Sequence, residues 1–167
     1  SGDLILLAVL VGDTTSTPST PSGFALLYGP DTNGTSRGFT YGKISDGTET
    51  GNLSITTNSS AQCRARMFRI TGTASSSYTE GGNTSTANSD TPTDAGVTTS
   101  GPDRLAINIG YFADDRNAAS FTGETGRNWT QAVAEYATST GSPDGTIDLQ
   151  IADMASAGTI NGGTQAD

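Results

Sequence analysis

The stretch Leu4-Ile5-Leu6-Leu7-Ala8-Val9-Leu10-Val11 is the longest apolar run in the sequence and decides the fold class. Gly2 and Gly12 stand on either side of it. A continuous apolar run of this length fits a β-strand that is covered on both faces, as at the centre of a β-sandwich. A buried helix is the alternative, although eight residues are few for one. We therefore predict a central strand.

Further short strands are predicted along the chain, because apolar and β-branched segments alternate with turn residues. They fall at residues 24–28, 39–44, 53–56, 61–70, 104–113, 130–138 and 147–151. The segment 130–138 also fits a helix, but the Pro143-Asp144-Gly145 turn that follows favours a hairpin. In segment 104–113, we expect Leu105, Ile107, Ile109 and Tyr111 to face the core, in a second central strand.

Two strands are predicted to be amphipathic. In segment 53–56, Leu53 and Ile55 should face inward. In segment 147–151, the apolar residues alternate with Asp148 and Gln150, which predicts a half-exposed strand.

These segments predict an all-β fold: an antiparallel β-sandwich, jelly-roll-like, with long polar loops. The 167 residues suit a single domain, 1–167. Residues 71–100 are rich in Ser, Thr, Gly and Asn, so we expect an extended polar excursion there. The tail from Ser156 is small and polar, with no closing strand expected. Both ends therefore read as if flanking terminal strands were missing.

Composition excludes several classes of function. The chain has no His and one Cys, which removes the commonest general base and every cysteine-based metal cage. Its net charge is −9, from 8 basic and 17 acidic residues, which argues against a nucleic-acid partner. The longest apolar run is far shorter than the roughly 20 residues that span a membrane, so no membrane partner is expected.

Candidate ligand-binding residues are few. Arg64 and Arg66 share one face of segment 61–70 and could grip a carboxylate or a sugar acid. Pairing with acids on neighbouring strands is the structural alternative. Trp129, the only Trp, could form an aromatic platform for sugars with Phe121 and Tyr136.

Candidate ion-binding and reactive residues are weaker still. Asp31, Asn33 and Thr35 offer oxygens at alternate positions around Gly34, as at the start of a Ca²⁺ loop, although the same residues also make a plain turn. A structural Ca²⁺ is the one ion that the sequence suggests, and no cofactor is expected. Cys63 should be buried and inert on the face opposite the arginines, with Ala65 and Met67. The pair Asp114-Asp115 is expected to be solvated rather than catalytic.

Five motifs occur in a characteristic order. They are Ser1–Ala8, Pro21–Leu27, Tyr41–Glu49, Ala61–Gly72 and Gly101–Ala106. This series resembles a β-sandwich domain of tailed-phage virion proteins, found in tail fibres and head-surface proteins and also in some bacterial surface proteins. The motifs describe strand entries and turns, so the resemblance carries no catalytic residue. Members of that family have one more strand before Gly-Asp-Leu and a final apolar strand.

The resemblance implies a non-enzymatic structural protein on the virion surface, such as a capsid decoration, a spike or a tail-fibre domain. Its expected partners are copies of itself and other virion proteins. The alternative is a carbohydrate-binding module of a bacterial surface or secreted protein, which would bind host-surface glycans.

Overall fold

The regular structure of this protein consists of β-strands. The computed structural model describes residues 2–33, 35–72, 97–99, 101–112, 120–122, 130–136, 145–160 and 164–166. Within these ranges every regular element is a strand, and every strand pair is antiparallel. The all-β prediction is therefore confirmed for this part of the chain. No helix long and apolar enough to span a membrane occurs in it.

The chain divides into two compact units, residues 1–80 and residues 81–167. Each unit contains its own main sheet.

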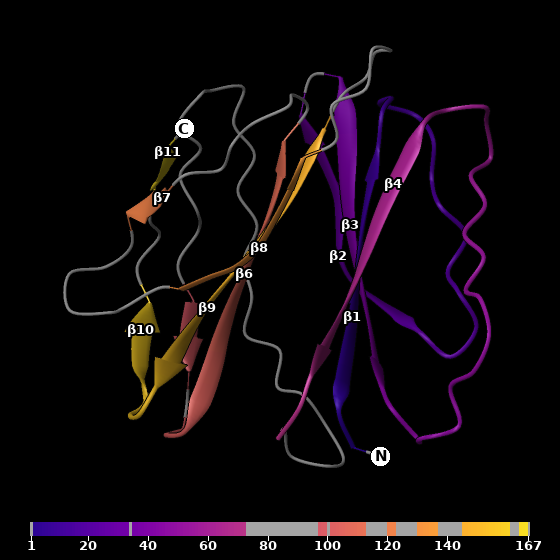
Figure 1. Ribbon diagram of the computed structural model, residues 1–167. Coiled ribbons are helices and arrows are strands. Elements are labelled where there is room, and N and C mark those ends of the chain that lie inside the picture. The colour runs from indigo at the N-terminus through magenta and orange to yellow at the C-terminus, as the bar shows by residue number, and fades with distance from the viewer. Residues whose placement is uncertain are drawn as a thin grey trace. The chain divides into compact units, whose positions relative to one another are not determined.

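The first unit contains a four-stranded sheet with the apolar run at its centre. Its strands are β1 (Leu4–Val11), β2 (Ala25–Asn33), β3 (Ser36–Ile44) and β4 (Cys63–Ile70). Their order is β2-β3-β1-β4 (Figure 1). β1 pairs along its whole length with both neighbours, so the predicted central strand is confirmed.

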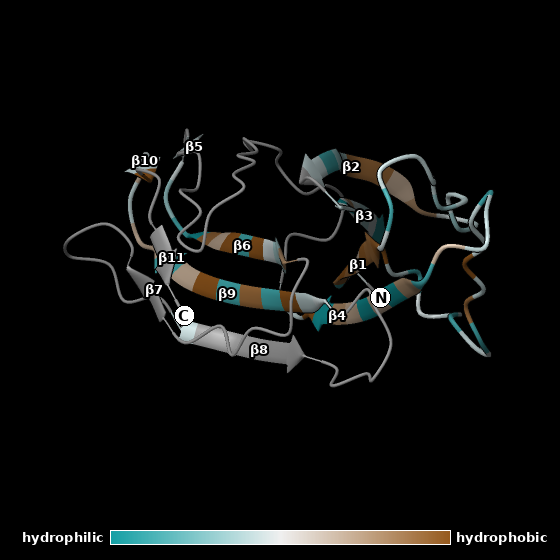
Figure 2. Ribbon diagram, turned by 90° about the horizontal axis from the view of Figure 1, so that it is seen from above, coloured by the Kyte–Doolittle hydropathy of each residue, from teal (hydrophilic) through white to brown (hydrophobic). Residues whose placement is uncertain are grey.

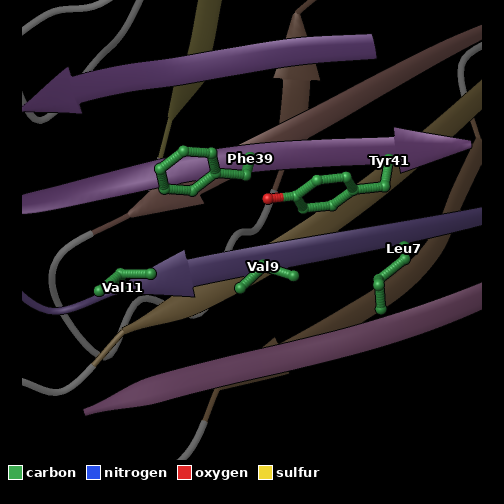
Figure 3. Close-up of a cluster of buried hydrophobic side chains, with 5 residues drawn as sticks. All are labelled: Leu7, Val9, Val11, Phe39 and Tyr41. Atoms are coloured by element: carbon green, nitrogen blue, oxygen red, sulfur yellow. The ribbon is translucent and has the colours of Figure 1, made fainter. Parts of the chain in front are cut away.

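Every residue of β1 is buried, which means that both of its faces are covered. One face carries Leu7, Val9 and Val11, which pack with Phe39 and Tyr41 of β3 (Figure 3). We call these five residues the β1–β3 cluster. Phe24, Ile55 and Ala61 pack against this cluster from the loops. The other face of β1 carries Leu4, Leu6, Ala8 and Leu10, and the whole strand is strongly hydrophobic (Figure 2).

β2 extends beyond the predicted segment 24–28, since Gly29-Pro30-Asp31 does not end it. Its register with β3 shifts twice, between Leu26 and Tyr28 and between Tyr28 and Asp31. β2 is an edge strand, and edge strands tolerate Pro and bulges. Gly29 is required here: its φ is 113°, and a Cβ would lie 2.6 Å from the Gly38 carbonyl oxygen.

The predicted strand at residues 53–56 is wrong. The only bridge in this region joins Thr57 to Pro18. Leu53, expected to face inward, is 37% exposed, whereas Ile55 does pack on the β1–β3 cluster. Alternation of apolar residues is insufficient here, because a strand also needs a partner along its length.

The second unit contains a three-stranded sheet of β6 (Arg104–Phe112), β9 (Thr146–Met154) and β8 (Thr130–Tyr136), in the order β6-β9-β8. Segment 130–138 is thus a strand rather than a helix. β9, rather than β6, is the central strand, which corrects the prediction for segment 104–113.

The faces of β6 also differ from the prediction. Leu105 is 37% exposed, and Ile107, Ile109 and Tyr111 are half-buried. The opposite face is the better covered one: Ala106 packs there with Ala152, Met154 and Ile160. On β9, Asp148 and Gln150 are buried, so the prediction of a half-exposed strand is wrong.

Two short strand pairs complete the described part of the second unit. β5 (Val97–Thr99) pairs with β10 (Gly158–Ile160), and β7 (Ser120–Thr122) pairs with β11 (Thr164–Ala166). The tail after Ser156 therefore contributes strands that were not predicted. β5 is a strand at the end of the predicted polar excursion 71–100, of which residues 73–96 and 100 lie outside the described residues.

We expect Leu7→Ala to lower the free energy of unfolding by about 2–5 kcal/mol, because the substitution leaves a cavity in the β1–β3 cluster. Leu53→Ala is the matched control and should cost less than about 1 kcal/mol, because Leu53 is partly exposed. Urea titration measures both. Equal losses for the two leucines would show that the β1–β3 cluster is not the core of this unit.

Candidate functional site

The two candidate arginines lie side by side on β4. Arg64 is opposite Leu10 of β1 and Arg66 is opposite Ala8, so both belong to one face of the sheet, as predicted. Both are half-buried. The neighbouring β1 positions on this face are apolar, so β1 supplies no carboxylate to them. Their pairing with acids and their binding of a ligand both stay predictions.

Cys63 does not fit the prediction of a buried thiol. The side chain is exposed, together with Ala65 and Met67 on the same face of β4. Arg69 also lies on this face, and its Nε and Nη2 atoms contact Asp3 Oδ2 at 2.7 and 2.6 Å. Partial desolvation still raises the pKa of the Cys63 thiol, so the protonated, poorly nucleophilic form dominates at neutral pH.

The proposed aromatic platform is not described by the structure. Trp129 lies outside the described residues. Phe121 belongs to β7 and Tyr136 to β8, whose main-chain partners are β11 and β9. The sugar-binding hypothesis for these three residues therefore stays a prediction.

The predicted calcium loop coincides with the turn between β2 and β3. Asp31 pairs with Gly38, and Asn33 pairs with Ser36, which leaves Gly34 and Thr35 as the connection. Gly34 lies outside the described residues, so the calcium-binding hypothesis for Asp31, Asn33 and Thr35 stays a prediction. In the described part of the chain, no three Asp, Glu or Cys side chains gather closely enough to hold a metal ion.

A polar cluster that was not predicted joins two loops of the first unit. Asp13 Oδ1 accepts hydrogen bonds from the amides of Thr15 and Ser16 at 2.9 and 2.5 Å. Asp13 Oδ2 accepts from the Ser16 hydroxyl and from the Ser59 hydroxyl, and the two hydroxyls contact each other. Ser16 is buried. We call Asp13, Ser16 and Ser59 the latch.

The latch places two serine hydroxyls beside a carboxylate, as in a catalytic site where a general base activates a serine nucleophile. The Ser16 hydroxyl and the Ser16 and Thr15 amides lower the pKa of Asp13 to about 2. So weak a base does not take a proton from a serine hydroxyl at neutral pH. The geometry instead suits a structural role, because Asp13 ties the end of β1 to the Ser59 loop.

A second carboxylate braces the turn after β3. Glu49 contacts Lys43 Nζ at 3.0 Å, accepts a hydrogen bond from the Ser45 hydroxyl at 2.8 Å and accepts from two turn amides. The Ser45 hydroxyl and the Lys43 ammonium lower the pKa of Glu49 to about 2. In the same turn, the Thr48 hydroxyl and amide lower the pKa of Asp46. These groups fasten a turn.

The second unit has a buried polar row on one face of β9. Thr146, Asp148 and Gln150 occupy alternate positions, and Asp148 and Gln150 are only 1% and 2% exposed. Gln150 Nε2 donates a hydrogen bond to Asp148 Oδ2 at 2.8 Å. Gln150 Oε1 is buried and has no hydrogen-bond partner among the residues that the structure describes. A buried carboxylate is costly unless it is well partnered, so this row bears on stability.

We expect the stability of the folded chain to decline as the pH falls from about 4 to 2. The folded pKa values of Asp13 and Glu49 are about 2, below unfolded values of about 3.9 and 4.3. A lowered folded pKa gives stability that is complete above the unfolded value and is lost as the pH falls through the folded one.

Asp13→Asn should lower the stability at pH 7 and reduce the decline toward pH 2. Asp103→Asn is the control, because Asp103 is exposed and takes no part in the latch. Urea titrations at pH 7, 4 and 2.5 test this. If Asp13→Asn shows the full decline, Asp13 does not cause it.

We expect Asp148→Asn to cost on the order of 1–3 kcal/mol, because it replaces a carboxyl group by an amide within a buried hydrogen-bonded row. Asp153→Asn on the same strand should change stability by less than about 0.5 kcal/mol, because Asp153 is exposed. Thermal or urea unfolding compares the two variants. Similar small effects would mean that the carboxyl group of Asp148 is unimportant for the fold.

No protein-family model, curated protein or solved structure matches this chain. The latch and the β9 row are therefore understood from their own contacts.

Proposed function

We propose that this chain is a non-enzymatic structural module on the surface of a phage virion, as a capsid decoration, a spike or a tail-fibre domain. The sequence motifs that resemble virion β-sandwich domains support this proposal, and so does the all-β, antiparallel architecture. A structural module needs a rigid scaffold and fixed loops rather than a reactive centre.

The observation that carries the proposal is that the polar side chains of the first unit hold its loops and turns in place. The latch and the Glu49 turn direct their carboxylates to backbone amides, serine hydroxyls and one lysine. Both carboxylates have a low pKa; Asp13 joins two loops, and Glu49 fastens the turn after β3. Such groups stiffen a surface, and they are poorly suited to proton transfer at neutral pH.

The charge balance supports a surface location. With 17 acidic and 8 basic residues, the chain is strongly negative. Like charge between neighbouring copies limits unspecific association at high local density. Specific contacts then have to come from particular strands and apolar groups.

We propose that the main sheets belong to a β-sandwich of the jelly-roll type. On one face of the first sheet, Leu4, Leu6 and Leu10 of β1 and Phe68 of β4 are buried, with Arg64 and Arg66 half-buried on the same face. A buried apolar strand face requires a second layer, and sheet-on-sheet packing is the usual solution for antiparallel folds.

The partners that we propose are copies of this chain and other virion proteins. β4 is the last strand of its sheet among the described residues, and it is regular over eight residues. Its exposed face carries Cys63, Ala65 and Met67, of which Met67 is 46% exposed. A regular edge with exposed apolar groups is suited to strand addition or packing by a neighbour.

The test is the association state of the purified chain and its contacts in the particle. Light scattering at increasing concentration should show a homo-oligomer, and a map of the particle should show contacts that bury more than about 1,000 Å² in total. Met67→Lys should weaken the oligomer at least about tenfold in dissociation constant, since a charge replaces an exposed apolar contact. Leu53→Lys, in an exposed loop, should leave it unchanged.

A chain that stays monomeric at high concentration, and makes only small contacts in the particle, would contradict the assembly proposal. Binding to bacterial surface glycans by such a monomer would favour the carbohydrate-binding module instead. If Met67→Lys leaves the oligomer intact, the proposal of a homo-oligomer stands, but β4 is excluded as its interface.

A further inference from the structure

Two loops of the first unit lie over the β1–β3 cluster. Residues 12–24 connect β1 to β2, and residues 45–62 connect β3 to β4. The first loop contributes Phe24, and the second contributes Ile55 and Ala61, to the packing against the cluster. We call these two loops together the cover.

The two loops are joined to each other by hydrogen bonds along their length. The Ser19 amide donates to the Thr56 carbonyl at 2.7 Å, and the Thr56 amide and hydroxyl donate to Ser19 Oγ. The Thr17 amide donates to Asn58 Oδ1 at 2.9 Å. The latch adds the contacts of Ser59 with Asp13 and Ser16. Hydrogen bonds between residues more than 35 positions apart thus join the two loops.

The cover is also bonded to the sheet, but over the cluster these bonds are few and long. Tyr41 donates its hydroxyl to the Pro18 carbonyl at 3.4 Å, and Arg37 Nη1 donates to the Ser16 carbonyl at 3.1 Å and to Thr17 Oγ1 at 3.4 Å. The shorter bonds lie at the turn after β3, where Lys43 Nζ contacts Glu49 at 3.0 Å and the Ser45 backbone bonds to Gly2 and Asp3 at 2.7 and 2.8 Å. Over the cluster, the two loops are therefore bonded more closely to each other than to β3.

We infer that the parts of the cover over the cluster, residues 12–24 and 51–62, open and close together, with the latch as their fastening, while the four-stranded sheet and the Glu49 turn stay intact. Loops that are hydrogen-bonded to each other open cooperatively. Their opening costs less free energy than breaking the paired strands of the core. Opening uncovers Leu7, Val9, Val11, Phe39 and Tyr41. The apolar face of the β1–β3 cluster is thus hidden when the cover is closed and exposed when it opens.

Native-state hydrogen exchange of the full chain, followed by NMR, tests this inference. The amides of Thr17, Ser19 and Thr56 should exchange with one common opening constant, faster than the amides of β1. Ser59→Ala removes two hydroxyl contacts from the latch and should speed all three amides by the same factor, about tenfold. The amides of β1 should be unaffected.

Ser60→Ala is the matched control, since Ser60 is the next residue and takes no part in the latch. It should change none of these rates. Asp13→Asn provides a second variant and should act on the same three amides. If Ser59→Ala speeds Thr56 alone, the loops move independently and the inference fails. If the β1 amides speed up by the same factor, the opening is global unfolding, and the inference also fails.

Discussion

The constraint on which the described structure depends is the burial of β1 on both faces. Eight consecutive apolar residues leave no side that can face water, so the strand needs a partner on each edge and a layer on each face. β3 and β4 supply the edges. The cover supplies the layer over Leu7, Val9 and Val11. The long polar loops between the strands are thus part of the core's enclosure, even though few of their residues are apolar.

A chain with 32% hydrophobic residues has little apolar material for such a layer, and hydrogen bonds complete it. The partly buried apolar side chains that pack on the cluster from the cover are those of Phe24, Ile55 and Ala61. Serine, threonine and Asp13 then hold the loops in place. Each such bond contributes little after the competition with water, roughly 0.5–1.5 kcal/mol, so many are needed. This explains why polar residues at exposed positions have structural roles in this protein.

Sequence patterns identified the strongest strands and misjudged the weaker ones for physical reasons. β1 was predictable because eight apolar residues admit few other environments. Segment 53–56 alternates like a strand, but the loop beside it, residues 12–24, forms a single bridge, between Pro18 and Thr57 just after the segment. Cys63 was assigned to the buried face of β4, yet Arg64 and Arg66 occupy the better covered face. The aliphatic stems of arginines can lie along a half-buried surface, and residue-type patterns miss this.

The polar sites were beyond sequence analysis because their members meet only in the fold. Ser59 and Asp13 are 46 positions apart in the sequence, and no local motif predicts a contact between them. Asp148 and Gln150 alternate with apolar residues and therefore suggested a solvated face, whereas their burial depends on what covers β9. Their position still has a consequence for specificity. A slip of β9 by one residue would exchange this polar pair with Ile147 and Leu149, because side chains alternate between the faces. The Gln150–Asp148 hydrogen bond would then have to form on the opposite face of the sheet. The large apolar side chains of Ile147 and Leu149 would take the places that the polar pair occupies now. The buried row thus disfavours the wrong register of the central strand.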